Sequence, residues 1–432
     1  MSDQRLFQIV TECRLCGSAD TEPCIDLGDQ YLASVFVPSN EGLPLDELKA
    51  PLSTFLCRGC GLLQLGQTVR RPALFTDYHY RSSTNPMMRR ALLDFAGDCA
   101  ARAPLAAGDH VLDTGCNDGT MLAFLPSSCR RFGIDPAANI SWRHLPGDIT
   151  VHQGFFGAEL AGRLSGGRSF KLVTSVAMLY SVEDILRFAH DVRHLLTDDG
   201  LWSIQVSYLP DMVRSLSFYD ICHEHLYYFT LRTLSQLLER CGFQVIDVSL
   251  NEVNGGSLRV HATHAGRNVT VSQSVSDLLA REKSEGWNEA APYHAFMKRT
   301  QALKLVIRDF IGDAVARGRL VIGLGASTKG NVLLQYFGID RSLLPYISER
   351  NPEKVGLRTL GTDIELISEE RARVLKPEAM LVLIWFFKDE LLIRERSYLE
   401  QDGGKLLFPM PYPHLVESSG VQTLWPAGQL VV

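Results

Sequence analysis

The feature that most constrains the fold is an apolar run that leads into an acidic residue and a glycine loop. Val111 and Leu112 precede Asp113, the loop Gly115-Cys116-Asn117-Asp118-Gly119 follows, and an apolar helical pattern runs from Thr120 to Leu125. This order predicts a β-strand, a tight turn and the start of a helix, because glycine lets the backbone turn sharply and approach a ligand. The N–H groups at the start of the helix would face that ligand.

A second short strand, Arg131-Phe132-Gly133-Ile134-Asp135, also ends in a carboxylate. An acid at this place suits the two hydroxyls of an adenosine ribose. The chain has no Gly-x-Gly-x-x-Gly and no Gly-Lys-[Ser/Thr] motif, which disfavours a dinucleotide or a triphosphate. The pattern resembles the S-adenosylmethionine (SAM) loop of class I methyltransferases; the alternative is an ordinary βα turn. The resemblance implies SAM contacts from Asp113, Gly115, Cys116, Asn117, Asp118, Gly119 and Asp135.

Composition excludes several classes of partner. The chain has 432 residues and a net charge of −6, so the basic footprint of a nucleic-acid-binding protein is absent. No apolar run approaches the roughly 18 residues that span a membrane. The segment Met1–Arg5 lacks the apolar core of a signal peptide, which predicts a cytoplasmic location. We expect a monomer, since covalently joined domains need no second chain to form a cleft.

Two Cys-x-x-Cys pairs, Cys13/Cys16 and Cys57/Cys60, predict a metal site in the N-terminal segment. Each pair places two thiolates on one tight turn, and two such turns form a tetrahedral sulfur site that suits Zn²⁺. Four unrelated thiols are the alternative, and a redox pair is disfavoured because no strand leads into a helix there. A closed site leaves no position for substrate, so we interpret the zinc as structural.

Alternating strands and helices predict an α/β protein with a parallel sheet. We expect a zinc-binding domain over residues 1–75, an α/β domain over 76–265, and a helical connector with a second Rossmann-like domain over 266–432. The expected connector helices are Ser274–Leu279, Glu282–Glu289 and Ala295–Arg317. The expected central strands are His110–Asp113, Arg131–Asp135, Thr150–His152, Leu172–Ser175, Leu201–Val206 and an antiparallel pair, Phe243–Leu250 and Ser257–His264.

The segment from Phe218 to Phe229 gathers histidines, acids and tyrosines just after the fifth central strand. Its core is Cys222-His223-Glu224-His225, where an adjacent acid and histidine can provide a general base and an orienting group. Ligands of α/β sheets bind at this end of the strands, which favours function. A metal site formed by the cysteine and the two histidines, or a polar loop with satisfied histidines, are the alternatives.

A second strand-to-loop-to-helix pattern lies at Gly323-Leu324-Gly325-Ala326. Backbone N–H groups, two hydroxyls and a lysine follow, a combination that suits a phosphate. The diphosphate of a nucleotide-linked substrate is the preferred interpretation; a structural relic of a Rossmann-like domain or a nicotinamide site are the alternatives. Candidate substrate contacts across the chain are His223, Asn254, Ser327, Thr328, Lys329, Asn331 and Arg350.

In order and spacing, these motifs resemble the nucleotide-sugar C-methyltransferases of deoxysugar biosynthesis over nearly the whole chain. The resemblance implies a small N-terminal zinc domain, a central class I methyltransferase Rossmann-like sheet and a C-terminal Rossmann-like domain. The matching stretches are Cys13-x-x-Cys16, Asp26-Leu27-Gly28, Cys57-x-x-Cys60-Gly61, the segment Tyr78 to Ser83, Gly115 to Gly119, Gly133-Ile134-Asp135-Pro136, His223-Glu224-His225, Asn254 to Arg259 and Gly325 to Asn331.

The resemblance implies a substrate and a mechanism. The substrate would be a dTDP-linked 4-keto deoxysugar, whose ketone acidifies the neighbouring C3 hydrogen. His225 would remove that hydrogen, Glu224 would orient the histidine or handle protons, and the resulting enolate carbon would attack the methyl group of SAM. Tyr80, or else Tyr78, would line the site. No metal is needed for the transfer, because SAM carries its own cationic leaving group.

The sequence departs from the family at three places. Cys222 stands where relatives usually have a tyrosine, and a thiol is a shorter and poorer hydrogen-bond partner. Leu179-Tyr180 and Trp385-Phe386-Phe387-Lys388 stand where relatives usually have a histidine. Cys222 favours O- or N-transfer to another small polar acceptor as an alternative. An NAD(P)H-using oxidoreductase is supported only by Gly323-x-Gly325, and the Glu-His segment disfavours a non-enzymatic zinc module.

Overall fold

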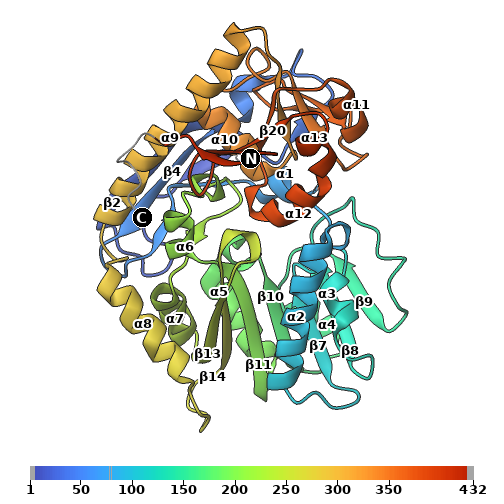
Figure 1. The fold of residues 1–432 in the computed structure, drawn as a ribbon. Coiled ribbons are helices and arrows are strands. Elements are labelled where there is room, and N and C mark those ends of the chain that lie inside the picture. The colour runs from blue at the N-terminus through green and yellow to red at the C-terminus, as the bar shows by residue number, and fades with distance from the viewer. Residues whose placement is uncertain (1–4, 77, 79, 426–432) are drawn as a thin grey trace.

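The central part of the chain folds around a seven-stranded sheet, drawn in cyan and green in the lower half of Figure 1. The computed structural model describes residues 5–76, 78 and 80–425. The strand order is β13-β14-β11-β10-β7-β8-β9, with β14 antiparallel to both of its neighbours. The bounds are β7 His110–Thr114, β8 Arg130–Asp135, β9 Ile149–Gln153, β10 Phe170–Val176, β11 Leu196–Ser207, β13 Phe243–Asn251 and β14 Ser257–His264. Every predicted central strand, including the antiparallel pair, is therefore confirmed.

Helices cover both faces of this sheet because successive side chains of a strand point to opposite sides. Val111 of β7 packs with α2 and α3 in one buried cluster, whereas Leu112 packs with α5 in another. Both strand residues are almost fully buried. The helices are α2 Pro86–Arg102, α3 Thr120–Phe124, α4 Ala158–Leu164, α5 Ile185–Leu195, α6 Leu209–Arg214 and α7 Leu231–Arg240.

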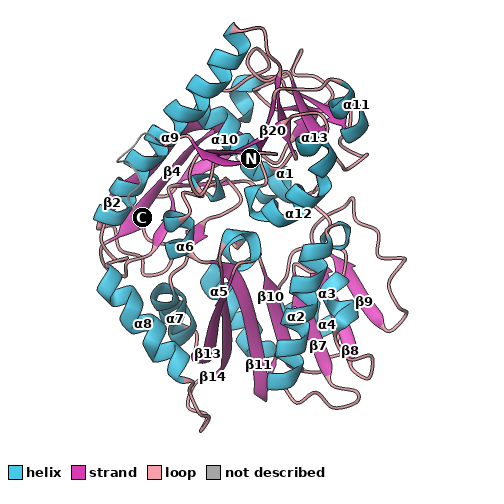
Figure 2. Cartoon of the chain, in the orientation of Figure 1, coloured by secondary structure: helices cyan, strands magenta, loops and turns pink. Residues whose placement is uncertain are grey.

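The C-terminal part forms the second Rossmann-like unit, in the upper half of Figure 1, and Figure 2 shows its strands flanked by helices. Its nine-stranded sheet has the order β22-β21-β20-β19-β15-β16-β18-β17-β3, and β20, β19, β15, β16 and β18 run parallel. The elements are β15 Val321–Leu324, α10 Thr328–Phe337, β16 Tyr346–Glu349, β17 Arg358–Thr359, β18 Glu365–Ser368, α11 Glu369–Val374, β19 Ala379–Val382, α12 Lys388–Arg394, α13 Arg396–Glu400, β20 Lys405–Phe408, β21 His414–Glu417 and β22 Gly420–Thr423.

The connector contains two long helices, α8 Gln273–Glu285 and α9 Ala291–Ala316. The predicted break near residue 280 is wrong, because α8 continues until Gly286 adopts a left-handed conformation, with φ of 73°. Glu282 stays inside the helix because it has buried partners. It accepts hydrogen bonds from the Tyr208 hydroxyl and from the backbone N–H groups of Leu231 and Arg232 at the start of α7. Among the described helices, none is long and apolar enough to cross a membrane.

The N-terminal segment is bound to both larger units. Its strand β5, Leu63–Leu65, pairs with the two-residue strand β12, Tyr227–Tyr228. Its strand β3, Phe36–Val37, pairs with β17 of the C-terminal sheet. The segments on either side of the predicted boundary near residue 75 therefore share β-sheets. The elements are β1 Phe7–Ile9, β2 Thr21–Tyr31, β3 Phe36–Val37, β4 Lys49–Cys57, β5 Leu63–Leu65, β6 Gln67–Val69 and α1 Arg71–Phe75.

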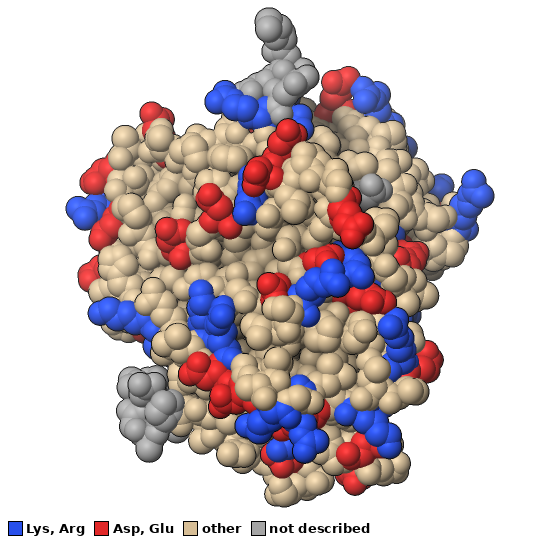
Figure 3. All heavy atoms as spheres, turned by 90° about the horizontal axis from the view of Figure 1, so that it is seen from above, with Lys and Arg blue, Asp and Glu red and all other residues tan. Residues whose placement is uncertain are grey.

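Figure 3 shows one face of the molecule, on which Lys and Arg are interspersed with Asp and Glu. The absence of a nucleic-acid partner stays a prediction. The predicted lack of a signal peptide rests on the first residues of the chain, and Met1–Gln4 lie outside the described part.

Candidate active site

A cavity of about 1020 Å³ lies between the carboxyl ends of the central strands and the C-terminal unit. This volume is at the upper end of the roughly 300–1,000 Å³ that is usual for ligand sites. All three parts of the chain contribute to its wall. The N-terminal segment contributes Ser34 and Phe36, the central unit the glycine loop and the Glu-His segment, and the C-terminal unit the loop that begins α10.

The first glycine loop folds as predicted. Gly115 has φ of 70°, and a Cβ there would lie 3.0 Å from Met178 Cγ. The Asn117 N–H donates to Asp135 Oδ2 at 2.8 Å, and the Ala137 N–H donates to Asp135 Oδ1 at 2.9 Å. Asp135 thus holds the loop while it lines the cavity, which leaves its remaining lone pairs for ribose hydroxyls. The residues fit SAM on these grounds.

Five of the seven predicted SAM contacts line the cavity: Asp113, Gly115, Cys116, Asn117 and Asp135. Asp118 and Gly119 lie outside its lining. Asp118 accepts hydrogen bonds from the Ser83 N–H and from Thr120, so it fixes the loop instead. Gly119 is the N-cap of α3, with φ of 79°.

Asp113 lies at the end of β7 and is almost fully buried. Burial raises the pKa of its carboxyl to about 7, although the Thr174 hydroxyl donates to it at 2.7 Å. The charge of this carboxyl is therefore sensitive to whatever binds beside it, and a cationic ligand would favour its ionised form.

Sequence reasoning missed residues at the ends of the next two strands. Phe155 and Phe156 follow β9, Ala177 and Met178 follow β10, and all four line the cavity. Phe156 packs on Phe188, with ring centroids 4.7 Å apart. Their position gives the signal that could have found them, because ligands of parallel sheets sit beyond the carboxyl ends of successive strands.

His225 lies in the cavity wall in a defined tautomer. Its Nδ1 is 2.8 Å from the Asp220 carbonyl oxygen, and since a carbonyl only accepts, Nδ1 carries the hydrogen. Nε2 then holds a lone pair. Burial, with a smaller contribution from the Lys329 ammonium, lowers the pKa of His225 to about 3, so the ring is neutral near pH 7. The Tyr180 ring lies against it, with centroids 4.1 Å apart.

Glu224 and Cys222 line the cavity beside this histidine. Glu224 is 6% exposed, and neither of its carboxyl oxygens has a hydrogen-bond partner among the described residues. Burial, and then the Glu224 carboxylate, raise the pKa of the Cys222 thiol well above its usual range. Cys222 is therefore a protonated thiol. A buried carboxyl group that has no such partner among the described residues can accept a hydrogen bond from a bound ligand.

Tyr78 and Tyr80 also line the cavity, with ring centroids 6.5 Å apart. Tyr80 is 41% exposed, and its carbonyl accepts a hydrogen bond from Asn117 Nδ2 at 3.1 Å. This bond joins the tyrosine segment to the first glycine loop. Residue 79 of the same motif lies outside the described residues.

Two predicted substrate contacts face away from the cavity. His223 is fully buried, with Nε2 3.2 Å from the carbonyl oxygens of Ala50 and Pro51 in β4. Asn331 is 2% exposed and donates to the Ala33 carbonyl at 2.7 Å. Both side chains satisfy backbone carbonyls of the N-terminal segment, so neither contacts a substrate directly.

Side chains of the second glycine loop make more contacts within the protein than predicted. Ser327 lines the cavity but caps α10 by accepting the Gly330 N–H at 3.0 Å, and Lys329 forms an ion pair with Asp220 Oδ1 at 2.5 Å. Thr328, Arg350 and Asn254 line the cavity as well. Sequence reasoning missed Lys354, which lines the same cavity and whose Nζ donates to the Ala326 carbonyl at 3.0 Å.

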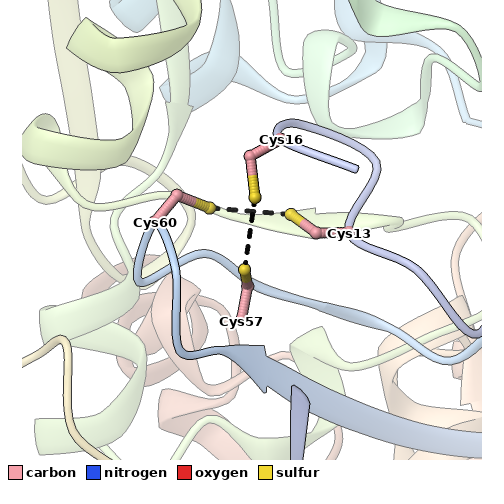
Figure 4. A group of neighbouring side chains, drawn as sticks. All are labelled: Cys13, Cys16, Cys57 and Cys60. Carbon is pink, nitrogen blue, oxygen red and sulfur yellow. Dashed lines mark hydrogen bonds between the residues drawn. The ribbon is translucent and has the colours of Figure 1, made fainter. Parts of the chain in front are cut away.

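The four predicted metal ligands converge (Figure 4). Cys13 and Cys60 Sγ are 3.6 Å apart, Cys16 and Cys57 Sγ are 3.4 Å apart, and all four sulfurs lie within 4.8 Å of one another. Tetrahedral Zn–S bonds of about 2.3 Å place sulfurs about 3.8 Å apart, so the cluster fits Zn²⁺. The set is closed by four protein ligands, as in structural sites.

The zinc cluster is joined to the Glu-His segment by backbone pairing. Strand β5 begins three residues after Cys60, and its Leu63 and Gln64 pair with Tyr228 and Tyr227 of β12. The Leu65 N–H also donates to the Leu226 carbonyl at 3.0 Å, one residue after His225. The metal site therefore supports the strand that anchors the candidate base.

Comparison with known families assigns each part of the chain. Residues 80–248 match the family described as a methyltransferase domain, and residues 252–411 match the C-methyltransferase C-terminal domain. Residues 13–75 match a zinc binding domain. The last match and the sulfur geometry identify the four-cysteine cluster as a zinc site.

One relative matches this chain along nearly its whole length. C-methyltransferase NovU of Streptomyces niveus is 31% identical over 420 residues, which cover 96% of this chain and 99% of the relative. Among solved structures, magnesium protoporphyrin IX methyltransferase from Synechocystis PCC 6803 covers 42% of this chain and 89% of its own, at 14% identity and a TM-score of 0.33. A SAM-dependent methyltransferase from Clostridium acetobutylicum covers 41% of this chain and 92% of its own, at 13% identity and a TM-score of 0.30.

The match to NovU spans nearly the whole of both chains, and the C-terminal match is to the family described as the C-methyltransferase C-terminal domain. The central sheet, its glycine loop and the carboxylate of Asp135 have the arrangement expected for a SAM site. The chain therefore belongs to the family of SAM-dependent C-methyltransferases.

Proposed function

We propose that this enzyme methylates a carbon atom of a nucleotide-linked 4-keto deoxysugar through an enolate. The observation that carries the proposal is the pairing of two groups in one cavity wall. His225 is neutral with Nε2 free to accept a proton, and Glu224 is a buried carboxylate without a hydrogen-bond partner among the described residues. Both lie in the same cavity as the SAM loop.

The chemistry needs a base beside an acidified C–H bond. His225 Nε2 takes the hydrogen from the carbon next to the ketone, and the electron pair of that C–H bond moves onto the ketone oxygen. SAM, when bound, supplies a methyl group from its sulfonium sulfur. The C–S bond breaks, and the leaving group is neutral S-adenosylhomocysteine. The enolate carbon forms the new C–C bond, and the proton remains on His225 until the product leaves.

A histidine with a low pKa can still act in this step. In the free enzyme, burial and the Lys329 ammonium disfavour the imidazolium. Negative charge develops on the ketone oxygen as the proton moves, and a nearby anion raises the proton affinity of the ring. Glu224 is a second acidic group in the same cavity wall.

The N-terminal end of α10 is the proposed site for the diphosphate of the substrate. Thr328 offers a hydroxyl and Arg350 a guanidinium that is 57% exposed, next to backbone N–H groups at the positive end of the helix. Asn254, which has φ of 56°, lies in the same cavity and would contact the sugar. Ser327 contributes by holding the helix start in place.

The proposal is tested by the product. The protein is incubated with a dTDP-linked 4-keto deoxysugar and SAM that carries a ¹³C-labelled methyl group, and the product is analysed by NMR. We expect a labelled methyl group bonded to a ring carbon. A labelled O-methyl group, or no product from any nucleotide-linked keto sugar, would overturn the proposal. His225→Ala serves as the control for transfer without the base.

A further inference from the structure

Lys329 lies in the first turn of α10 and is held on several sides. Its Nζ is 2.5 Å from Asp220 Oδ1, 5.1 Å from the centre of the Phe386 ring and 5.9 Å from the centre of the Tyr219 ring. Its side chain is 17% exposed, and that of Asp220 is 6% exposed. A lysine that neutralises a buried acid is poorly placed to bind a diphosphate as well, because leaving that acid unpaired is costly.

Asp220 connects this lysine to the candidate base. Its carboxylate pairs with Lys329, and its carbonyl oxygen accepts the Nδ1–H of His225 at 2.8 Å. The same residue therefore receives one interaction from the C-terminal unit and orients one ring in the central unit. The bond to Nδ1 fixes the tautomer that leaves the Nε2 lone pair free.

The short helical turn that contains Asp220, Phe218–Asp220, is held by α10 at a second point. The Phe218 ring stacks on Phe337, with centroids 5.2 Å apart, and also contacts Tyr336 at 5.4 Å. Helix α10 thus holds this turn through an aromatic contact near its C-terminal end and through an ion pair at its N-terminal end. A shift of α10 would move the Asp220 carbonyl and the His225 ring with it.

We propose that Lys329 is a positioning residue for methyl transfer: through Asp220 it holds His225 in the orientation and tautomer that the base requires. This inference rests on the proposed function. It assigns to the C-terminal unit a part in forming the catalytic centre of the central unit, beyond binding the nucleotide. Phosphate binding is then left to Thr328, Arg350 and the helix terminus.

The electrostatics agree with this role. Burial raises the pKa of the Asp220 carboxyl, and the Lys329 ammonium opposes that rise. Among the described residues, the charged and titratable groups that contact His225 or act on its pKa are the Tyr180 phenol, the Asp220 carboxylate and Lys329, and Cys222 and Glu224 lie in the same cavity wall. Lys329 is the cation of this set, so removing it raises the affinity of His225 for a proton.

The first test separates positioning from substrate binding. Lys329→Met keeps the length of the side chain and removes its charge. We expect kcat to fall by about 10- to 100-fold while the KM for the nucleotide sugar changes by less than about 3-fold, since a displaced base affects the chemical step. A KM that rises about 10-fold or more with kcat retained would identify Lys329 as a substrate ligand and overturn the inference.

Two further variants keep this test interpretable. Lys304→Met is the matched control: Lys304 is a lysine of α9 that contacts the Tyr336 ring at 4.8 Å and lies outside the cavity lining. Its kcat should equal that of the wild type. Lys329→Arg retains the charge and should recover most of the lost kcat. Unchanged SAM affinity in all three proteins shows that they are folded, and if Lys329→Met does not fold, Asp220→Asn removes the same ion pair and keeps the carbonyl.

The second test does not depend on turnover. Spectra of protein with ¹³C-labelled histidine, assigned with His225→Gln, report the tautomer and the protonation of His225. We expect His225 to remain the neutral Nδ1–H tautomer from pH 5 to pH 8 in the wild type. In Lys329→Met the His225 ring should become protonated at a higher pH than in the wild type. A tautomer population and a titration curve that are both identical in the two proteins would overturn the inference, whereas absence of turnover with every nucleotide sugar in the wild type would overturn the proposed function alone.

Discussion

The two Rossmann-like units use the same device to hold their glycine loops. In the central unit, Asp135 accepts the backbone N–H groups of Asn117 and Ala137. In the C-terminal unit, Glu349 accepts those of Ala326 and Asn351 at 3.0 and 2.7 Å. Each acid ends the second strand of its unit and joins the loop after the first strand to the turn after the second.

The two glycine loops differ in the surroundings of their polar groups: some line the cavity, whereas others contact the protein itself. In the central unit, Asp113 at the end of β7 and Cys116 and Asn117 of the loop lie in the cavity wall before the short helix α3. In the C-terminal loop, Ser327 caps the longer helix α10 and Lys329 crosses to Asp220 of the other unit. The difference teaches that a shared strand-to-loop-to-helix pattern marks a place for a ligand, whereas the contacts of each side chain decide between cofactor binding and support.

Loss of a zinc ligand should have the largest effect. It should weaken the pairing of the N-terminal segment with the central unit more than its pairing with the C-terminal unit. Cys57→Ser removes binding energy that is also folding energy, about 10–16 kcal/mol for a whole structural zinc site. We expect loss of zinc and faster hydrogen exchange in β5 and β12. Strands β3 and β17 should be less affected, because they lie outside the two Cys-x-x-Cys turns. Metal analysis and hydrogen exchange check this. Cys24→Ser, a buried cysteine outside the cluster, is the control, and full zinc content in Cys57→Ser would contradict the assignment.

Removal of the base should affect the central unit alone. His225→Ala is expected to lower turnover by about 10²- to 10⁴-fold, as is typical for the loss of a general base. SAM affinity should be unchanged, because His225 is not one of the predicted SAM contacts. Steady-state kinetics and calorimetric titration measure the two quantities. Turnover equal to that of the wild type would exclude His225 from the mechanism.

Matched changes of the two acids test the comparison itself. Asp135→Ala removes two backbone hydrogen bonds to a charged group and the ribose acceptor, so SAM affinity should fall by about 10- to 100-fold. Glu349→Ala removes the equivalent pair in the C-terminal unit and should leave SAM affinity within about 2-fold. Calorimetry with S-adenosylhomocysteine measures both. Equal losses would mean that the two loops are not functionally distinct.

The smallest expected effect is on stability at mildly acidic pH. The pKa of His225 is lowered to about 3 in the folded state, whereas an unfolded histidine titrates near about 6.5. The unfolded state therefore binds more protons between these values, and stability that is fully present above pH 6.5 is lost as the pH falls. Between pH 7 and pH 5, the free energy of unfolding of His225→Gln should fall by about 2 kcal/mol less than that of the wild type, as measured by urea unfolding. Identical losses would contradict a neutral buried ring.

The sequence predicted the central sheet well because its strands are apolar runs that end at glycine or acidic residues. It missed β2 and β4, because Thr21–Tyr31 and Lys49–Cys57 mix polar residues and proline with apolar ones. Five of its seven predicted SAM contacts line the cavity, and its four predicted zinc ligands converge. These motifs are local, so spacing alone is informative.

The remaining site residues depend on contacts between distant segments. His223 and His225 are of one type, yet one binds backbone carbonyls of β4 and the other lines the cavity. Lys329 suits a phosphate by its place in the loop, and only the fold brings Asp220 to it. Composition and spacing carry no information on such pairings. The monomeric state and the cytoplasmic location stay predictions.

Hydrogen exchange at the carbon next to the ketone tests the account most directly. A dTDP-linked 4-keto deoxysugar is incubated in deuterated water with the enzyme and S-adenosylhomocysteine, so that proton removal occurs without methyl transfer. We expect the wild type to catalyse deuterium incorporation at that carbon, Lys329→Met to do so more slowly, and His225→Ala to give only the background rate. Incorporation at the wild-type rate in His225→Ala would contradict the account.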